Sequence, residues 1–290
     1  MELIFLQFAV LALAFAVFEM LATDRLARRL RNAGIVDIVW SGGFAVLVLL
    51  FLGLAANHYY DAKLNGFPEW IWQRAAVFTL LVVIWSLRLA AHLFVRVKSH
   101  HPVEDVRYAR LRADWGKATD RKMSAFFQLQ GVLQIALMTP FLFIYLNERI
   151  EAIHFGILWR FGLGPFEWIG IALWLIALAG EALADAQLKS FRADPVNKGK
   201  VCQAGLWYYS RHPNYFFEWL IWVAYFLFAC GSPWGWVSVL CPVLMGHFLV
   251  NVTGIPMTEE LSVKSKGDAY RDYQRTTSAF VPWFKKGGNN

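Results

Sequence analysis

Charged residues are scarce in this chain, and their scarcity is the first constraint on its fold. Only 17% of the 290 residues are charged, compared with about 25% in a soluble globular domain. Hydrophobic residues make up 58% and aromatic residues 17%, with 14 tryptophans among them. This composition excludes an ordinary soluble domain and predicts an all-α integral membrane protein.

Cysteines and the motifs of soluble enzymes are also lacking. The chain has three cysteines, Cys202, Cys230 and Cys241, which are too few for a disulfide framework and show no metal-ligand spacing. It contains no glycine-rich dinucleotide fingerprint, Walker motif, zinc pattern or Ser/His/Asp arrangement. We therefore predict no metal, and a bound nucleotide would have to be held by helices and not by a Rossmann domain.

Long apolar runs dominate what is present. A helix needs about 20 residues to cross a hydrocarbon core of roughly 30 Å. Seven runs approach or exceed that length, at 2–22, 34–56, 74–97, 123–146, 166–188, 214–230 and 234–254. No linker divides them. We predict seven transmembrane helices in a single integral membrane domain, 1–290, with a cofactor-binding half at about 166–284.

The loops between these runs alternate in charge. Lysine and arginine gather at 25–31, 96–122, 189–211 and in the tail after 254, whereas the loops at 57–73 and 147–166 have little excess of either. Cytoplasmic loops of membrane proteins collect lysine and arginine. We predict an external N-terminus and a cytosolic C-terminus, and we interpret the net charge of +7 as an orientation signal and not as a sign of nucleic-acid binding.

The stretch 204–218 sets Arg211, His212, Asn214 and Glu218 directly against an apolar run. Pro213 is tolerated in the first turn of a helix, so we predict a helix from this point to about 228. The positive end of that helix, with Arg211 and His212, would make a seat for a phosphate. A helix cap with an arginine reaching to the headgroups is the structural alternative.

A polar stripe leads toward this stretch. Glu181, Asp185, Lys189 and Arg192 recur every three or four residues and therefore share one helix face. The carboxylates could bind ribose hydroxyls, and Lys189 and Arg192 could bind phosphates. The alternative is a helix terminus held by salt bridges.

An amphipathic segment follows the last apolar run. Pro256 should break the helix, and Glu259 and Glu260 open a cytosolic segment with aromatic anchors. This segment continues through Tyr270, Arg271 and Tyr273. It would close over a cofactor as a lid, or it would lie on the headgroups.

Asp37 lies near the start of the second apolar run, where a carboxylate is costly unless it has a partner. Arg88 and His92, four residues apart on one helix face, could meet it. The cluster would be a structural ion pair or a group that delivers protons and orients a substrate. Gln130 and Gln134 also share a face, and we expect them to make hydrogen bonds between helices.

Several of these segments carry a resemblance. The stretch 205–218, Glu259–Glu260, Tyr270–Arg–Asp–Tyr273 and Phe280–Val–Pro282 resemble the superfamily that joins steroid 5-alpha-reductases to isoprenylcysteine carboxyl methyltransferases. The segments 104–108, 111–116 and 126–131 look like its bacterial branch, the domain of unknown function 1295. The similarity runs from the second helix to the C-terminus.

The resemblance implies a seven-helix protein that takes NADPH from the cytosol and reduces an enone double bond of a lipid. Its cofactor pattern falls on Asp185, Arg192, Asn214 and Glu218. The steroid reductases polarise the enone carbonyl with a Gln-Glu pair in helix two and a tyrosine in helix three. This chain has Asp37 in the first of those regions and Arg88 or His92 in the second.

We therefore expect an NADPH-dependent reductase in a bacterial inner membrane, with its cofactor site facing the cytosol and a steroid-like or polyprenyl substrate entering from the bilayer. The expected catalytic residues are Asp37, Arg88 and His92. The expected cofactor-binding residues are Asp185, Lys189, Arg192, Arg211, His212, Asn214, Glu218, Glu259, Glu260, Tyr270, Arg271 and Tyr273. An S-adenosylmethionine-dependent methyltransferase and a non-enzymatic lipid-binding membrane protein are the alternatives.

Overall fold

The computed structural model describes residues 2–63, 70–145 and 163–285. Most of the predicted 147–166 loop and part of the 57–73 loop lie outside these residues. The described residues are helical, with one isolated bridge between Ser210 and Ser278 as their only β pairing. The contacts divide the chain into two units. Unit 1 comprises Met1–Phe166 with Ala229–Ser238, and unit 2 comprises Glu167–Phe228 with Val239–Asn290.

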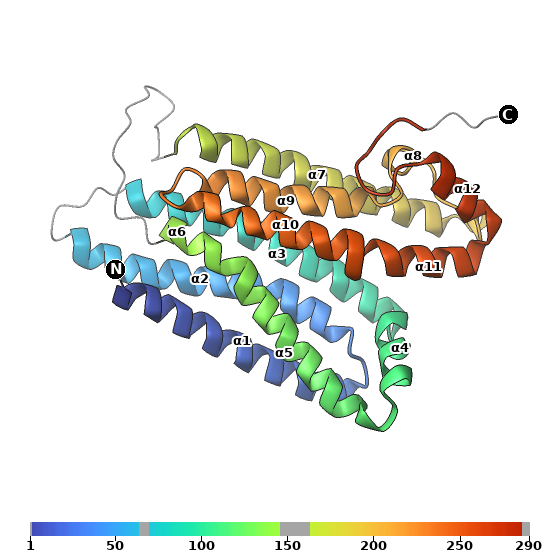
Figure 1. Ribbon diagram of the computed structural model, residues 1–290, viewed down its shortest axis with the longest axis horizontal. Helices are drawn as coiled ribbons and strands as arrows, with labels where there is room; N and C mark the ends of the chain where they lie inside the picture. The colour runs from blue at the N-terminus through green and yellow to red at the C-terminus, as the bar shows by residue number, and fades with distance from the viewer. Residues whose placement is uncertain (1, 64–69, 146–162, 286–290) are drawn as a thin grey trace. The chain divides into compact units, whose positions relative to one another are not determined.

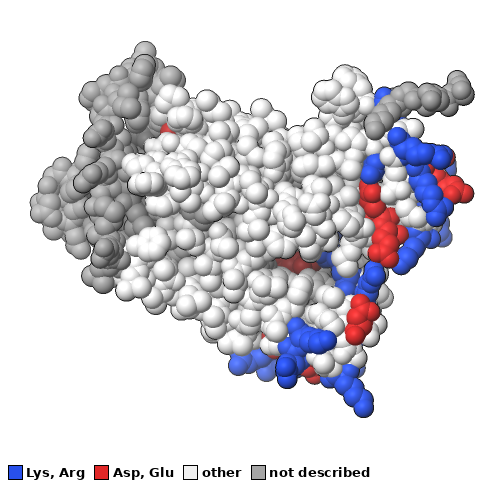
Figure 2. All heavy atoms as spheres, viewed as in Figure 1, with Lys and Arg blue, Asp and Glu red and all other residues white. Residues whose placement is uncertain are grey.

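Unit 1 is a bundle of long helices with a short helix at one end (Figure 1). Its helices are α1 (Glu2–Leu30), α2 (Ile35–Lys63), α3 (Trp70–His100), α4 (Val106–Trp115), α5 (Thr119–Met138) and α6 (Leu142–Tyr145). The helix α2 packs along α3 and α1, and α5 crosses α1. On the face shown in Figure 2, charged side chains of this unit lie over α4 and the nearby ends of α1 and α5, whereas the surface along the helices is almost entirely uncharged.

Unit 2 contains the remaining elements of the chain. They are α7 (Pro165–Ala193), α8 (Leu206–Tyr209), α9 (Pro213–Ala229), α10 (Leu240–His247), a π-helical turn (Phe248–Val252), α11 (Ile255–Lys266) and α12 (Asp268–Thr276). The helix predicted to start at Pro213 is confirmed. The helix break predicted at Pro256 is confirmed, but it lies about one turn before the proline. The π-helical turn ends at Val252, and Pro256 lies in the first turn of α11.

Five helical segments are long and apolar enough to span a membrane. They are Phe5–Leu30, Ile35–Asn57, Gln73–His100, Pro165–Ala193 and Gly235–Lys266. The other two predicted spans, 123–146 and 214–230, are helical over 123–145 and 214–229, but α9 has only 17 residues and α5 carries Asp120, Arg121 and Lys122 in its first turn. Among the described residues, five of the seven predicted spans are thus both long enough and apolar enough to cross a membrane.

Close contact between α7 and α9 organises the helices of unit 2. Gly170 on α7 faces the backbone of α9, and a Cβ at this position would lie 2.8 Å from the carbonyl oxygen of Ala224 and from the nitrogen of Phe228. One turn further on, the Trp174 indole donates a hydrogen bond to the Tyr225 hydroxyl at 3.3 Å. A residue without a side chain is what lets two helix backbones approach this closely.

We predict that Gly170→Ala lowers the free energy of unfolding by about 1–3 kcal/mol, the usual cost of overpacking a tight contact. The added methyl group would meet backbone atoms of α9, which cannot move aside as the end of a side chain can. The matched control is Gly53→Ala on α2, where a Cβ would meet nothing within 4 Å. That change should be neutral or stabilising by up to about 1 kcal/mol, since alanine is the better helix former. Chemical unfolding in detergent measures both, and equal stability of the two variants would contradict the close contact.

Candidate functional site

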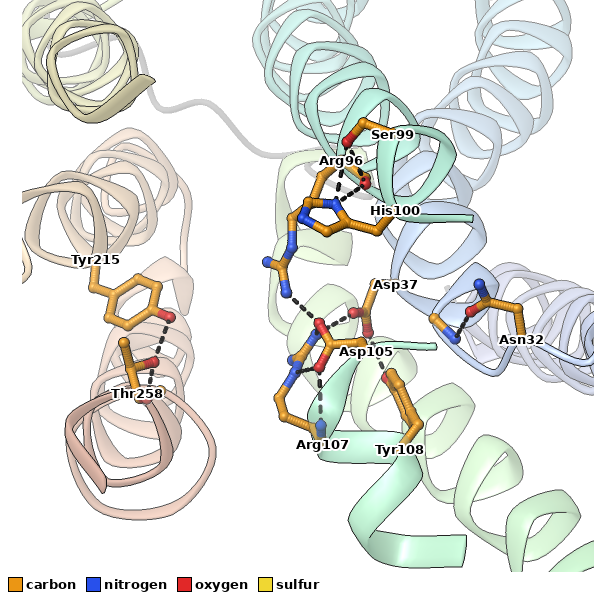
Figure 3. Close-up of polar contacts among 12 residues, drawn as sticks. Asn32, Asp37, Arg96, Ser99, His100, Asp105, Arg107, Tyr108, Tyr215 and Thr258 are labelled. Atoms are coloured by element: carbon orange, nitrogen blue, oxygen red, sulfur yellow. Dashed lines mark hydrogen bonds and ion pairs between the residues drawn. The ribbon is translucent and has the colours of Figure 1, made fainter. Parts of the chain in front are cut away.

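Asp37 lies in the first turn of α2 and is held by two residues of α4 (Figure 3). The Arg107 guanidinium donates to one carboxylate oxygen at 2.6 Å, and the Tyr108 hydroxyl donates to the other, also at 2.6 Å. The predicted partners were Arg88 and His92, and that pairing is wrong. The α4 segment follows the end of α3 and brings its own cation and phenol to the start of α2, so the carboxylate is satisfied there.

The preceding residues fix α4 in position. Asp105 caps the helix by accepting from the Arg107 backbone at 3.0 Å and from its Nε at 2.9 Å, and it also pairs with Arg96. Glu104 accepts from the Ala33 backbone at 2.6 Å, which ties α4 to the turn between α1 and α2. Burial would raise the pKa of Asp105, but the hydrogen bonds and charge of Arg107 outweigh it and lower the pKa to about 2.

Tyr108 is the buried member of this cluster, with 4% of its surface exposed. Burial and the neighbouring Asp37 charge raise the pKa of its hydroxyl well above the usual value. The phenol therefore keeps its proton at neutral pH and remains a hydrogen-bond donor. Its position combines a proton-bearing oxygen with a carboxylate that can accept from it, which is the arrangement that a general acid or a carbonyl-polarising group requires.

A second polar cluster, in unit 2, centres on Arg211. Its Nε donates to Glu259 at 2.6 Å, and its Nη1 donates to the carbonyl oxygens of Gln274 at 2.9 Å and Thr277 at 2.6 Å. The Arg211 backbone also donates to the carbonyl oxygen of Ser278 at 2.9 Å. These contacts give the guanidinium a structural role, since it fastens the C-terminal segment to the start of α9. Binding a phosphate here would compete with them.

His212 is buried beside this clamp. Its Nε2 lies 3.2 Å from the Glu259 carboxylate, and its ring stacks on Tyr215 with centroids 5.4 Å apart. Burial lowers the pKa of His212, and the Glu259 hydrogen bond offsets this only in part. The imidazole is therefore neutral near pH 7 and donates its Nε2 proton to Glu259. A second contact between α9 and α11 is made by the Tyr215 hydroxyl, which lies 3.3 Å from the Thr258 hydroxyl (Figure 3).

The helices α7 and α9 bring together two of the predicted cofactor residues. The Asn214 amide donates to Asp185 at 3.3 Å, and both side chains are partly exposed. Lys189 and Arg192, further along α7, are exposed. A carboxylate beside an amide suits ribose hydroxyls, and exposed cations suit phosphates, so these four residues fit a dinucleotide. Glu218 is more deeply buried and accepts from the Trp222 indole at 3.1 Å.

The remaining predicted cofactor residues lie on α11 and α12, and two of them pair within their own helix. Glu260 pairs with Lys264 at 2.7 Å, and Arg271 pairs with Asp268 at 2.7 Å, all with exposed side chains. Tyr273 donates to the carbonyl oxygens of Trp207 and Ser210, and burial raises the pKa of Tyr270 to about 12. Tyr273 thus joins α12 to α8, and a role for these residues as a cofactor lid stays a prediction.

Sequence reasoning missed Arg107, Tyr108 and Glu19. The first two lie in the Asp-Val-Arg-Tyr segment, which served only as a mark of resemblance although an aspartate before a helix is a capping signal. Glu19 is a carboxylate near the end of the first apolar run and is 7% exposed in the structure. It hydrogen-bonds Gln134 on α5, whose amide also donates to the carbonyl oxygen of Trp40 at 3.0 Å. The hydrogen bonding between helices predicted for Gln134 is thus confirmed.

The long apolar helices, with polar clusters at their ends, define a helical multi-pass membrane protein. The chain belongs to the family described as "Protein of unknown function (DUF1295)", whose model matches residues 25–277. An uncharacterized protein of Schizosaccharomyces pombe is 26% identical over an aligned length of 235 residues, and the match covers 72% of this chain and 64% of that protein. The match thus spans less than two thirds of the relative's length. No solved structure matches the chain.

The buried imidazole predicts a pH dependence of stability. Because the folded state lowers the pKa of His212, the unfolded chain binds more protons as the pH falls through about 6.5, and stability is lost on acidification. We expect the melting temperature to fall between about pH 7.5 and about pH 5.5, and His212→Gln to reduce that fall. His247→Gln, at an exposed position of α10, is the control and should keep the full dependence. Equal pH profiles for wild type and His212→Gln would contradict this assignment.

Proposed function

We propose that this protein is an NADPH-dependent reductase of an activated, enone carbon–carbon double bond in a lipid-soluble, steroid-like substrate. The observation that carries the proposal is Tyr108, a buried phenol that keeps its proton and donates to Asp37 at 2.6 Å. When bound, NADPH supplies the hydride. The protein supplies a proton-bearing oxygen for the carbonyl end of the enone and shields the reaction from water.

In this proposal Tyr108 and Asp37 polarise the enone carbonyl. The resemblance assigns this role to a carboxylate of helix two and a tyrosine. The hydroxyl of Tyr108 turns its proton from Asp37 toward the carbonyl oxygen of the substrate. Arg107 stays on the other oxygen of Asp37, so the carboxylate remains held in place while the phenol moves. A donor of this kind, aimed at a developing oxyanion, contributes about 3 kcal/mol to transition-state stabilisation.

Cofactor binding belongs to unit 2 in this proposal. Asp185 and Asn214 bind the ribose hydroxyls, and Lys189 and Arg192 bind phosphates. The basic segment 189–211 faces the cytosol, where NADPH is available, which requires the seven-span topology with an external N-terminus. In a bacterium, this orientation puts the protein in the inner membrane. The arrangement of Asp185 beside Asn214, with the exposed cations further along α7, supports this part of the proposal.

Ligand binding can be tested by the thermal stability of the purified protein in detergent. A ligand at 100 times its Kd should stabilise the folded state by roughly 2.7 kcal/mol. We expect NADPH to raise the melting temperature more than NADH or S-adenosylmethionine does. A shift with S-adenosylmethionine alone would instead support methyl transfer, and no shift with any of the three would count against an enzyme of either kind.

The same assay tests the individual cofactor residues. Asn214→Ala and Arg192→Ala should each weaken NADPH binding by about 1.5–3 kcal/mol, as expected for hydrogen bonds to charged groups. Arg275→Ala, which removes an exposed cation on α12, is the control and should bind NADPH normally. Normal binding by both Asn214→Ala and Arg192→Ala would mean that the cofactor site lies elsewhere.

The donor is tested separately from the cofactor. With a cyclic α,β-unsaturated ketone as substrate, Tyr108→Phe should lower kcat about 10²–10³-fold, as the loss of an oxyanion donor does. The NADPH-induced shift should be unchanged. Tyr145→Phe is the matched control, because Tyr145 is also buried in unit 1 but shares its hydrogen bond with Thr79, at 2.7 Å, and not with a carboxylate. If Tyr145→Phe and Tyr108→Phe lower kcat equally, Tyr108 is not the donor.

A further inference from the structure

Unit 1 contains an apolar cavity of about 200 Å³ where three of its helices end or begin. Its walls come from the last residue of α1, Asn32 in the turn that follows, the first turn of α2, the last turns of α3 and His101 just beyond α3. The apolar side chains that line it are Leu30, Ile35, Ile38, Phe94 and Val97. Leu30 is 47% exposed and Phe94 52% exposed, so the cavity opens at the surface of unit 1.

The size of the cavity limits its occupant. Pockets for whole drug-sized molecules have volumes of about 300–1,000 Å³. A cavity of about 200 Å³ with an open mouth is therefore too small to enclose a steroid and suits a segment of a flexible hydrocarbon chain.

Two basic residues, Lys98 and His101, also line the cavity, and both are exposed. The Lys98 ammonium lies 5.9 Å from the centroid of the Phe94 ring, which puts the charge within cation–π distance of this apolar wall. Neither residue has an ion-pair partner in the part of the chain that the structure describes. An anionic group could bind both.

The neighbouring carboxylates do not neutralise this rim, because each is paired with an arginine. Asp105 pairs with Arg96 and Arg107, Glu104 pairs with Arg112 at 2.8 Å, and Asp37 pairs with Arg107 at 2.6 Å. The electrostatic character of the cavity mouth is therefore set by the basic side chains. Apolar walls beneath a cationic rim are complementary to an anionic amphiphile.

The position of the cavity along the candidate membrane spans indicates which kind of amphiphile would bind there. The three helices that form it are candidate membrane spans, and the cavity lies where these spans, Phe5–Leu30, Ile35–Asn57 and Gln73–His100, end or begin. This is the level at which hydrocarbon gives way to headgroups. Basic pockets between membrane helices at this level bind the headgroups of anionic lipids.

We propose that this cavity binds an anionic phospholipid, with part of an acyl chain against Ile35, Ile38 and Phe94 and the phosphate on Lys98 and His101. The site is separate from the Asp37 cluster. Ile35 and Ile38 are three residues apart and share a face of α2, whereas Asp37 contacts α4. The bound lipid joins the ends of α1, α2 and α3, and its binding does not depend on the proposed reductase activity.

The test compares phosphatidylglycerol with phosphatidylcholine of the same acyl chains, added to the delipidated full-length protein in detergent. Native mass spectrometry counts the lipids that stay bound, and thermal unfolding measures stabilisation. We expect one phosphatidylglycerol to be retained and to raise the melting temperature more than phosphatidylcholine does. Inorganic phosphate alone should not reproduce the shift, because the acyl contacts would be missing. Equal retention of both lipids, or an equal shift with inorganic phosphate, would overturn the proposal.

Variants then locate the site. Lys98→Ala should weaken phosphatidylglycerol binding about fivefold, as expected for the loss of a lysine near a lipid surface, and His101→Gln should weaken it as well. Lys117→Ala, at an exposed position beyond α4, is the matched control and should bind phosphatidylglycerol as the wild type does. Ile38→Trp fills the cavity and should reduce retention of the lipid. The exposed Lys98 and His101 can be replaced without disturbing the core, so unchanged binding by the double variant would refute the site.

Discussion

The pairing of the Asp37 carboxylate with two residues of α4 is the interaction on which one end of unit 1 depends. Its two oxygens hold Arg107 and Tyr108, and these contacts hold α4 against the start of α2. A carboxylate at the end of an apolar helix is costly unless each oxygen is satisfied, so the helix start and the α4 segment stabilise each other. One ion pair thereby fixes a helix and presents a protonated phenol at a defined place.

In unit 2 an arginine, and not a carboxylate, is the residue that holds separate helices together. Arg211 binds a carboxylate of α11 and two carbonyl oxygens at the end of α12, so helices that are distant in sequence meet at the start of α9. Three hydrogen bonds of its guanidinium go to protein groups, and in the proposed function the cofactor contacts fall instead on Asp185, Asn214, Lys189 and Arg192. The same physical requirement, that buried charge be paired, separates structural residues from candidate binding residues.

The sequence predicted the parts of the fold that depend on local chemistry. Apolar length located the helices, and Pro213 marked the start of α9 because proline is tolerated only in a first turn. The partner of Asp37 could not be found in this way, since Arg107 lies 70 residues away and the prediction considered only helix faces within the apolar runs. Spacing can show which residues share a face, but it cannot show which distant loop folds back to meet them.

The clamp on Arg211 also bears on the order in which the protein is made. The acceptors of its guanidinium and backbone include the carbonyl oxygens of Gln274, Thr277 and Ser278, more than 60 residues closer to the C-terminus. During synthesis from the N-terminus, this arginine enters the membrane surface long before its acceptors exist. The start of α9 must therefore stay hydrated or be held by other groups until residues 274–278 have been synthesised, so these contacts close only after that segment has left the ribosome.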